Sequence, residues 1–70
     1  MKYQVYGRRI EVLRTGVDYV VFALGTDGKK RIFNEIFIPS QVREDDVAGY
    51  LEDLLHEWAT PRNSQVIQTE

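Results

Sequence analysis

The sequence predicts an α+β domain: an antiparallel β-meander of three to four strands, followed by one C-terminal amphipathic helix packed on one sheet face. Three observations predict this class. Apolar and polar residues alternate in the first half of the chain, glycine-containing turn signals separate those stretches, and apolar residues recur at helical spacing in the second half. Seventy residues make one domain. We expect it to cover residues 1–61, and residues 62–70 to form a mobile polar tail.

The first two strands are predicted in the stretches "KYQVY" and "RIEVL", which alternate in opposite phase. A two-residue turn at Gly7-Arg8 would produce this change of phase. One long strand with a bulge at Gly7 would produce it too, and the sequence does not separate the two. The turn predicts four apolar side chains on one face, with Val5 opposite Ile10 and Tyr3 opposite Val12.

The next strand is predicted in "YVVFAL", which follows a turn at Gly16 and is apolar throughout. The Asp-Gly signal in "GTDG" then predicts a hairpin, so that "KKRIF" returns antiparallel to "YVVFAL". The stretch "NEIFIP" either extends that returning strand or forms a short edge piece ending at Pro39.

The helix is predicted between the acidic run Glu44–Asp46, which suits the positive end of a helix dipole, and Thr60-Pro61, which ends it. At about 100° per residue, its apolar side chains form one stripe facing the core. The stripe consists of Val47, Leu51, Leu54, Leu55 and Trp58, with Tyr50 at its flank.

The single histidine, His56, falls on the opposite side of this helix, close to Glu52 and Asp53. An acid–base pair requires a shaped pocket with shifted pKa values, which an exposed helix face does not supply. We therefore interpret this group as a solvated polar face.

Composition and motifs exclude several classes of function. There are no cysteines and one histidine, so disulfides, thiolate zinc sites and histidine metal sites are not expected. No apolar run approaches the roughly 18 residues of a membrane span, and the first residues lack the apolar region of a signal peptide, which favours the cytoplasm. No nucleophile elbow or phosphate loop is present. The chain is predicted not to be an enzyme and to bind no cofactor.

Charge is divided unevenly along the chain. Residues 1–33 carry seven Lys or Arg and three acids, a net charge of +4, whereas residues 34–70 carry two Arg and eight acids, a net charge of −6. The basic residues flank predicted turns near several aromatic residues, a pattern compatible with binding single-stranded nucleic acid. The acidic isoelectric point, about 5.3, opposes this, and lysines at sheet edges also prevent unwanted strand pairing. The residues concerned are Arg8, Arg9, Lys29, Lys30 and Arg31, with Tyr3, Tyr6, Tyr19 and Phe22 nearby.

The apolar surplus of the sheet favours a protein partner. One helix covers one face of a small sheet, yet "YVVFAL" is apolar on both faces, and "IFI" at residues 36–38 is a second such run. Loops, the tail or strand curvature would cover the second face in a monomer. Otherwise a second copy or another protein covers it, and the chain is a small interaction or regulatory module. The predicted partner surface is Tyr19, Val20, Val21, Phe22 and Leu24.

The overall pattern resembles a group of uncharacterised bacterial proteins of about 70 residues, classed as a domain of unknown function. The resemblance is carried by "MKYQVYGRRIEVLR", "GKKRIF" and "YLEDLLHEWATP", and it does not extend past Pro61. It implies a bacterial origin, and it implies no activity and no site residues.

Overall fold

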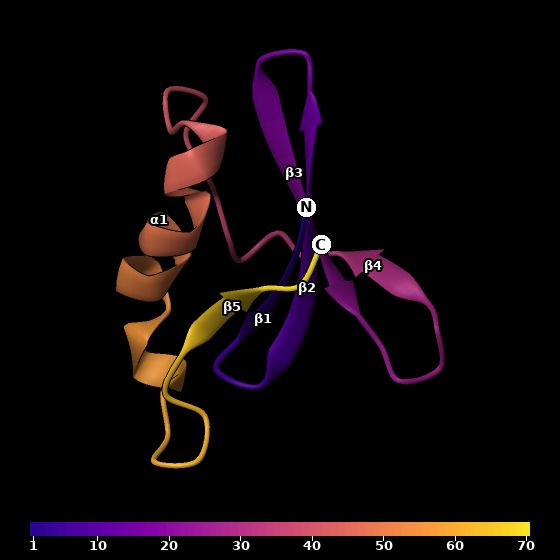
Figure 1. Ribbon diagram of the computed structural model, residues 1–70. Helices are drawn as coiled ribbons and strands as arrows, with labels where there is room; N and C mark the ends of the chain where they lie inside the picture. Colours follow the sequence, from indigo (N-terminus) through magenta and orange to yellow (C-terminus); the bar gives the residue numbers. More distant parts are fainter.

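The computed structural model describes residues 1–70 and contains one antiparallel sheet and one short α-helix. The helix α1 (Val47–Leu54) lies between two 3₁₀ turns, Glu44–Asp46 and His56–Trp58. Figure 1 shows it on one side of the sheet. The α+β class is confirmed, but the sheet has five strands, more than predicted. In the spatial order β4-β3-β2-β1-β5, the strands are β1 (Lys2–Val5), β2 (Arg8–Thr15), β3 (Asp18–Leu24), β4 (Lys30–Ile32) and β5 (Val66–Gln68).

The first hairpin turns at Tyr6-Gly7, one residue earlier than predicted. Both residues have positive φ, +50° and +84°, which is what a type I′ turn requires. The hairpin alternative is therefore confirmed over a bulged strand, but the predicted register is wrong, because Val5 lies opposite Arg8 and Tyr3 opposite Ile10. Since the pairing moves by two residues, the apolar side chains stay on the predicted face.

Tyr6 adopts an unfavourable backbone conformation, and the contacts of its side chain compensate for the energetic cost. Its ring is buried, and its hydroxyl donates a hydrogen bond of 3.0 Å to the carbonyl oxygen of Glu52 in α1. Burial raises the pKa of Tyr6 above its ordinary value. Strict alternation along "KYQVY" would place Tyr6 on the face opposite Tyr3, but the turn rotates its side chain onto the core.

The remaining turns follow the prediction. A two-residue turn with Gly16 at φ +64° joins β2 to β3, and the loop over residues 25–29 joins β3 to β4. The stretch "NEIFIP" forms no strand. Its residues still alternate, since Ile36 and Ile38 are buried and Phe37 is exposed.

The predicted mobile tail, residues 62–70, contributes a strand. Val66 of β5 lies opposite Val5, and the backbone N–H of Lys2 donates to the carbonyl oxygen of Glu70 at 2.9 Å. Figure 1 shows β5, in yellow, alongside β1. The boundary expected at Pro61 is corrected accordingly: without β5, the outer backbone groups of β1 would be unpaired. The stretch "QVIQ" is too short and polar to predict a strand by itself.

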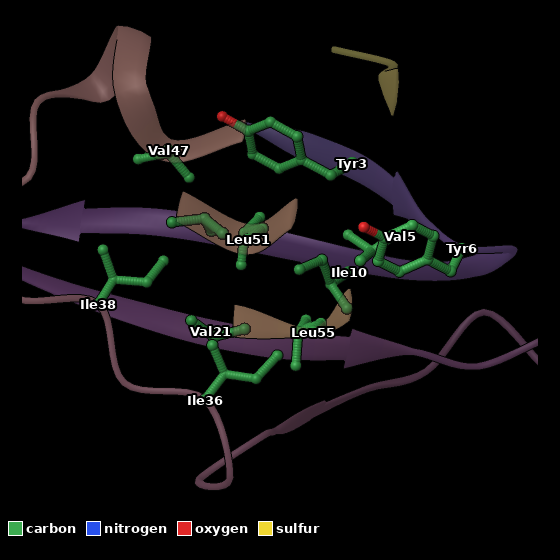
Figure 2. Packing of buried hydrophobic residues seen from close by; sticks show 11 residues of the cluster. Tyr3, Val5, Tyr6, Ile10, Val21, Ile36, Ile38, Val47, Leu51 and Leu55 are labelled. Carbon is green, nitrogen blue, oxygen red and sulfur yellow. The ribbon is translucent and has the colours of Figure 1, made fainter. Parts of the chain in front are cut away.

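The core lies between the sheet and α1. Figure 2 shows side chains from β1, β2, β3, α1 and the 36–38 segment converging on one space. The helix contacts β1 and β5, at one edge of the sheet. Leu54 is 43% exposed, so its predicted place in the buried stripe is wrong: at the sheet edge only part of the stripe meets a strand. The buried residues are Tyr3, Val5, Tyr6, Ile10, Val12, Val21, Ile36, Ile38, Val47, Leu51 and Leu55.

Tyrosine hydroxyls hold the connection between β4 and α1 to the rest of the domain. Tyr19 of β3 donates to the carbonyl oxygen of Val42, and Tyr50 of α1 donates to that of Phe37 at 3.0 Å. None of the helices has the length and apolar character needed to cross a membrane.

Candidate functional site

The sheet face opposite α1 carries a group of apolar side chains that we call the outer patch. Alternation along β3 shows which side chains lie on this face. Because Val21 points into the core, Val20, Phe22 and Leu24 point away from it. The register then adds one residue on each side, since Leu13 lies opposite Val20 and Ile32 opposite Phe22. None of the five packs against the core cluster. The outer patch is Leu13, Val20, Phe22, Leu24 and Ile32.

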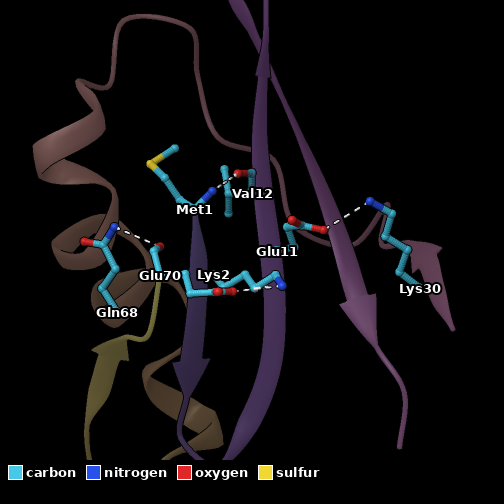
Figure 3. Close-up of polar contacts among 7 residues, drawn as sticks. All are labelled: Met1, Lys2, Glu11, Val12, Lys30, Gln68 and Glu70. Carbon is cyan, nitrogen blue, oxygen red and sulfur yellow. Dashed lines mark hydrogen bonds and ion pairs between the residues drawn. The ribbon is translucent and has the colours of Figure 1, made fainter. Parts of the chain in front are cut away.

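Two lysines beside the outer patch form ion pairs within the chain. The Nζ atom of Lys30 lies 3.2 Å from Glu11 Oε1 and 4.8 Å from the centre of the Phe22 ring. Lys2 Nζ lies 2.8 Å from Glu70 Oε2. Figure 3 shows both ion pairs: Lys30 of β4 reaches Glu11 of β2 across β3, and Lys2 of β1 meets Glu70, just past the end of β5. The hydrogen bond from Lys2 lowers the pKa of the Glu70 carboxyl and raises that of Lys2.

The predicted partner surface is split between the two faces of the sheet. Val20, Phe22 and Leu24 belong to the outer patch, whereas Tyr19 and Val21 point toward the helix side. Val21 is 4% exposed and belongs to the core, so it is not available to a partner. The prediction combined residues of both faces because it did not assign a face to the helix.

Leu13 and Ile32 of the outer patch were not predicted from the sequence. Leu13 is apolar but out of phase with Ile10 and Val12, which is a signal that it lies on the other face. Ile32 lies in a strand of three residues, too short for its phase to be read.

The outer patch continues around an open strand edge. The short strand β4 pairs with Phe22–Leu24 alone, and the one further bond to this edge runs from the Phe33 N–H to the Val21 carbonyl oxygen, at 2.8 Å. A mainly apolar pocket of about 250 Å³ lies here, lined in part by Val20 and Ile32. Ile32 is 63% exposed and Phe37, also in the lining, 73%.

The five basic residues of the predicted nucleic-acid patch gather at one end of the sheet but on different faces. Arg8 stacks over the Trp58 ring, Arg9 donates to the carbonyl oxygen of Gly25, and Lys30 pairs with Glu11. Arg31 lies opposite Ala23, and Lys29 is in the loop before β4.

Two of the aromatic residues considered for base stacking are not accessible. Tyr3 and Tyr6 are 1% and 5% exposed, because both belong to the core. Tyr19 is half-buried, and its hydroxyl donates a hydrogen bond to the carbonyl oxygen of Val42. Phe22 alone among the four lies on the outer patch.

His56 is exposed, as predicted, and so are Glu52 and Asp53. No three His, Asp or Glu side chains come together as they would around a metal ion. This part of the helix therefore presents a solvated polar surface.

A family model described as a domain of unknown function, DUF7661, matches residues 1–70. The chain belongs to the DUF7661 family. The match includes residues 62–70, which agrees with their forming part of the sheet. No curated protein and no solved structure matches the chain. The function of this DUF7661 domain must therefore be inferred from its own residues.

Proposed function

We propose that this DUF7661 domain is a small protein-interaction module that works as a homodimer, with the outer patches of two copies packed against each other. The observation that carries the proposal is a sheet with one covered face. All eleven buried side chains lie in the core between the sheet and α1, while no helix packs over the outer patch, where Ile32 is exposed and the other four residues are half-buried. Contiguous apolar surface of this kind is typical of protein contacts.

The charges beside the outer patch favour a second copy as the occupant. In a two-fold homodimer the same surface meets itself, so a face with one dominant charge would repel its copy. Here Lys30 is neutralised by Glu11 and Lys2 by Glu70, within each chain. When two such faces meet, the lysine charges beside Phe22 and β1 are already compensated, and the unpaired Arg9 lies toward the end of the sheet.

Small size is a second reason to favour self-association. A domain of about 70 residues buries only roughly 60% of its unfolded surface, and disulfides or metal sites often add stability at this size. This chain has no cysteines, and five strands and one helix supply a single core. Covering the outer patch with a second copy would add apolar burial.

Two matched charge substitutions test the homodimer. Phe22→Glu places a carboxylate in the outer patch, whereas Leu54→Glu places one at an exposed apolar residue of α1. We expect Phe22→Glu to convert the dimer to a folded monomer, while Leu54→Glu leaves the mass unchanged. Sedimentation velocity and circular dichroism measure the mass and the fold. Equal masses for both variants and the wild type would exclude the outer patch as the contact.

A second candidate function, binding of single-stranded nucleic acid, is favoured by the five cations at one end of the sheet. Titration with short RNA and DNA oligonucleotides tests it. Such binding must weaken steeply as salt is added, because it releases counterions. This function is excluded if no complex forms at low salt, or if a complex forms but does not weaken as salt is added.

We further propose that the domain acts in the bacterial cytoplasm, without catalysis, metal or cofactor. Resemblance to uncharacterised bacterial proteins supports the origin, and the lack of cysteines agrees with a reducing compartment. The lack of any catalytic motif supports a binding role.

A further inference from the structure

A pocket of about 340 Å³ lies at the end of the sheet where the β1–β2 turn and the β3–β4 loop meet. Its apolar lining includes Ile10, Ala23, Phe33 and Trp58. Ile10 and Ala23 point to the helix side of the sheet, so most of this apolar lining lies off the outer patch, of which only Leu24 borders the pocket. Its size suits a small ligand.

The aromatic residues of the pocket fix the position of Arg8. Its guanidinium carbon lies 4.2 Å from the centre of the Trp58 ring, and Trp58 is held edge-on by Phe33, with ring centres 6.0 Å apart. A guanidinium stacked on an aromatic face keeps its N–H groups in its own plane. The Arg8 guanidinium makes no hydrogen bond or ion pair within the chain, so these donors are free.

Positive charge at the pocket is not neutralised by the chain. The three ion pairs of the structure are Lys2–Glu70, Lys30–Glu11 and Arg43–Asp45, and neither Arg8 nor Arg9 takes part in them. Arg9 donates one bond, of 3.2 Å, to the Gly25 carbonyl oxygen, which places it at the rim.

An adjoining hollow adds further cations. It has a volume of about 350 Å³, shares Ala23 and Leu24 with the pocket, and is lined also by Lys29 and Arg31. Its one carboxylate, Asp27, accepts a hydrogen bond of 3.1 Å from the backbone N–H of Lys29. The positive charge around the two hollows therefore exceeds the negative.

We propose that this pocket binds a small aromatic anion, whose ring packs on the apolar lining and whose carboxylate or phosphate oxygens accept hydrogen bonds from Arg8. An apolar lining favours a ring, and the planar N–H groups of the Arg8 guanidinium beside it favour an oxyanion. A ligand that carries both groups therefore fits the pocket best. Arg9 supplies a second positive charge at the rim.

Titration of the ¹⁵N-labelled domain with phenylacetate and with phenyl phosphate tests the proposal and separates the two kinds of oxyanion. We expect saturable shifts at the Trp58 indole N–H, the Arg8 side chain and Phe33, and the tighter of the two probes identifies the preferred oxyanion. Benzyl alcohol, which has a ring without a charge, and inorganic phosphate, which has a charge without a ring, should each bind at least roughly tenfold more weakly.

Three variants assign the binding to Arg8. Arg8→Gln should weaken binding roughly tenfold or more, and Arg8→Lys, which keeps the charge but not the planar fork, should also weaken it. Arg43→Gln makes the same change of charge at an exposed site away from the pocket and should leave binding unchanged. Circular dichroism checks that each variant is folded.

Several results would overturn the proposal. These are the absence of saturable shifts with both aromatic anions, inorganic phosphate binding as tightly as phenyl phosphate, and equal affinities for Arg8→Gln and Arg43→Gln. Equal affinities for Arg8→Lys and the wild type would exclude the role given to the stacked guanidinium.

Discussion

At the scale of single residues, backbone conformation decides the register of the first hairpin. The turn requires two residues with positive φ, and Tyr6 with Gly7 meets this requirement because the tyrosine ring and hydroxyl gain contacts with the core and α1. Sequence pattern assigns glycine to such a site readily, but it cannot see the contacts that hold a tyrosine there. The prediction therefore placed the turn one residue late.

Replacing Gly7 with alanine should lower the free energy of unfolding by about 1–2 kcal/mol. Gly7 has φ +84°, and an added Cβ would lie 2.8 Å from Asn63 Cγ, in the segment before β5. Gly49→Ala is the matched control: its Cβ meets no atom within 4 Å, and alanine in a helix should stabilise by about 0.5–1 kcal/mol. Urea denaturation measures both values. A neutral Gly7→Ala variant would contradict the turn.

The ion pair between Lys2 and Glu70 should make the end of the sheet sensitive to acid. Because the folded pKa of Glu70 lies below its ordinary value of 4.5, the pair stabilises the fold above that pH. The contribution is lost as pH falls through the folded pKa. Carboxyl chemical shifts in a pH titration measure that pKa, and amide shifts of Lys2 and Thr69 report the pairing. Glu70→Gln should abolish the amide response in this window, and a Glu70 pKa at or above 4.5 would refute the pairing.

At the scale of secondary-structure elements, local pattern predicts the meander and the helix but not the fifth strand. Alternation, Gly16 and Asp27-Gly28 are local signals, and the elements they predict are found. The strand β5 depends on a partner 61 residues away, since Val66 pairs with Val5 and its own segment has little apolar character. Pairing at such separation leaves no periodic signal in the sequence.

The position of α1 over the sheet edge divides its apolar stripe. Leu51 is fully buried, whereas Leu54 is 43% exposed. We expect Leu51→Ala to lower the free energy of unfolding by about 2–5 kcal/mol and Leu54→Ala by less than about 1 kcal/mol. Thermal denaturation of the two variants at one pH measures the difference. Similar losses for both would mean that Leu54 is buried in solution.

At the scale of the whole molecule, the domain is one helix and one sheet with a single core between them. The stretch "YVVFAL" predicted a surplus of apolar residues, and Val20, Phe22 and Leu24 do lie outside the core. Its pattern could not divide the strand correctly, because the face that meets the helix depends on packing rather than on the strand itself. The same limit concealed the pocket, since Arg8, Phe33 and Trp58 are distant in sequence and meet only in the fold.

The proposed homodimer is tested most directly by the molar mass of the wild-type domain in solution. Light scattering over a concentration series measures it without a label or a substitution. The single chain has a mass of 8.2 kDa, and the homodimer predicts a value approaching twice this mass as concentration rises. A mass that stays at 8.2 kDa up to the highest attainable concentration would contradict self-association through the outer patch.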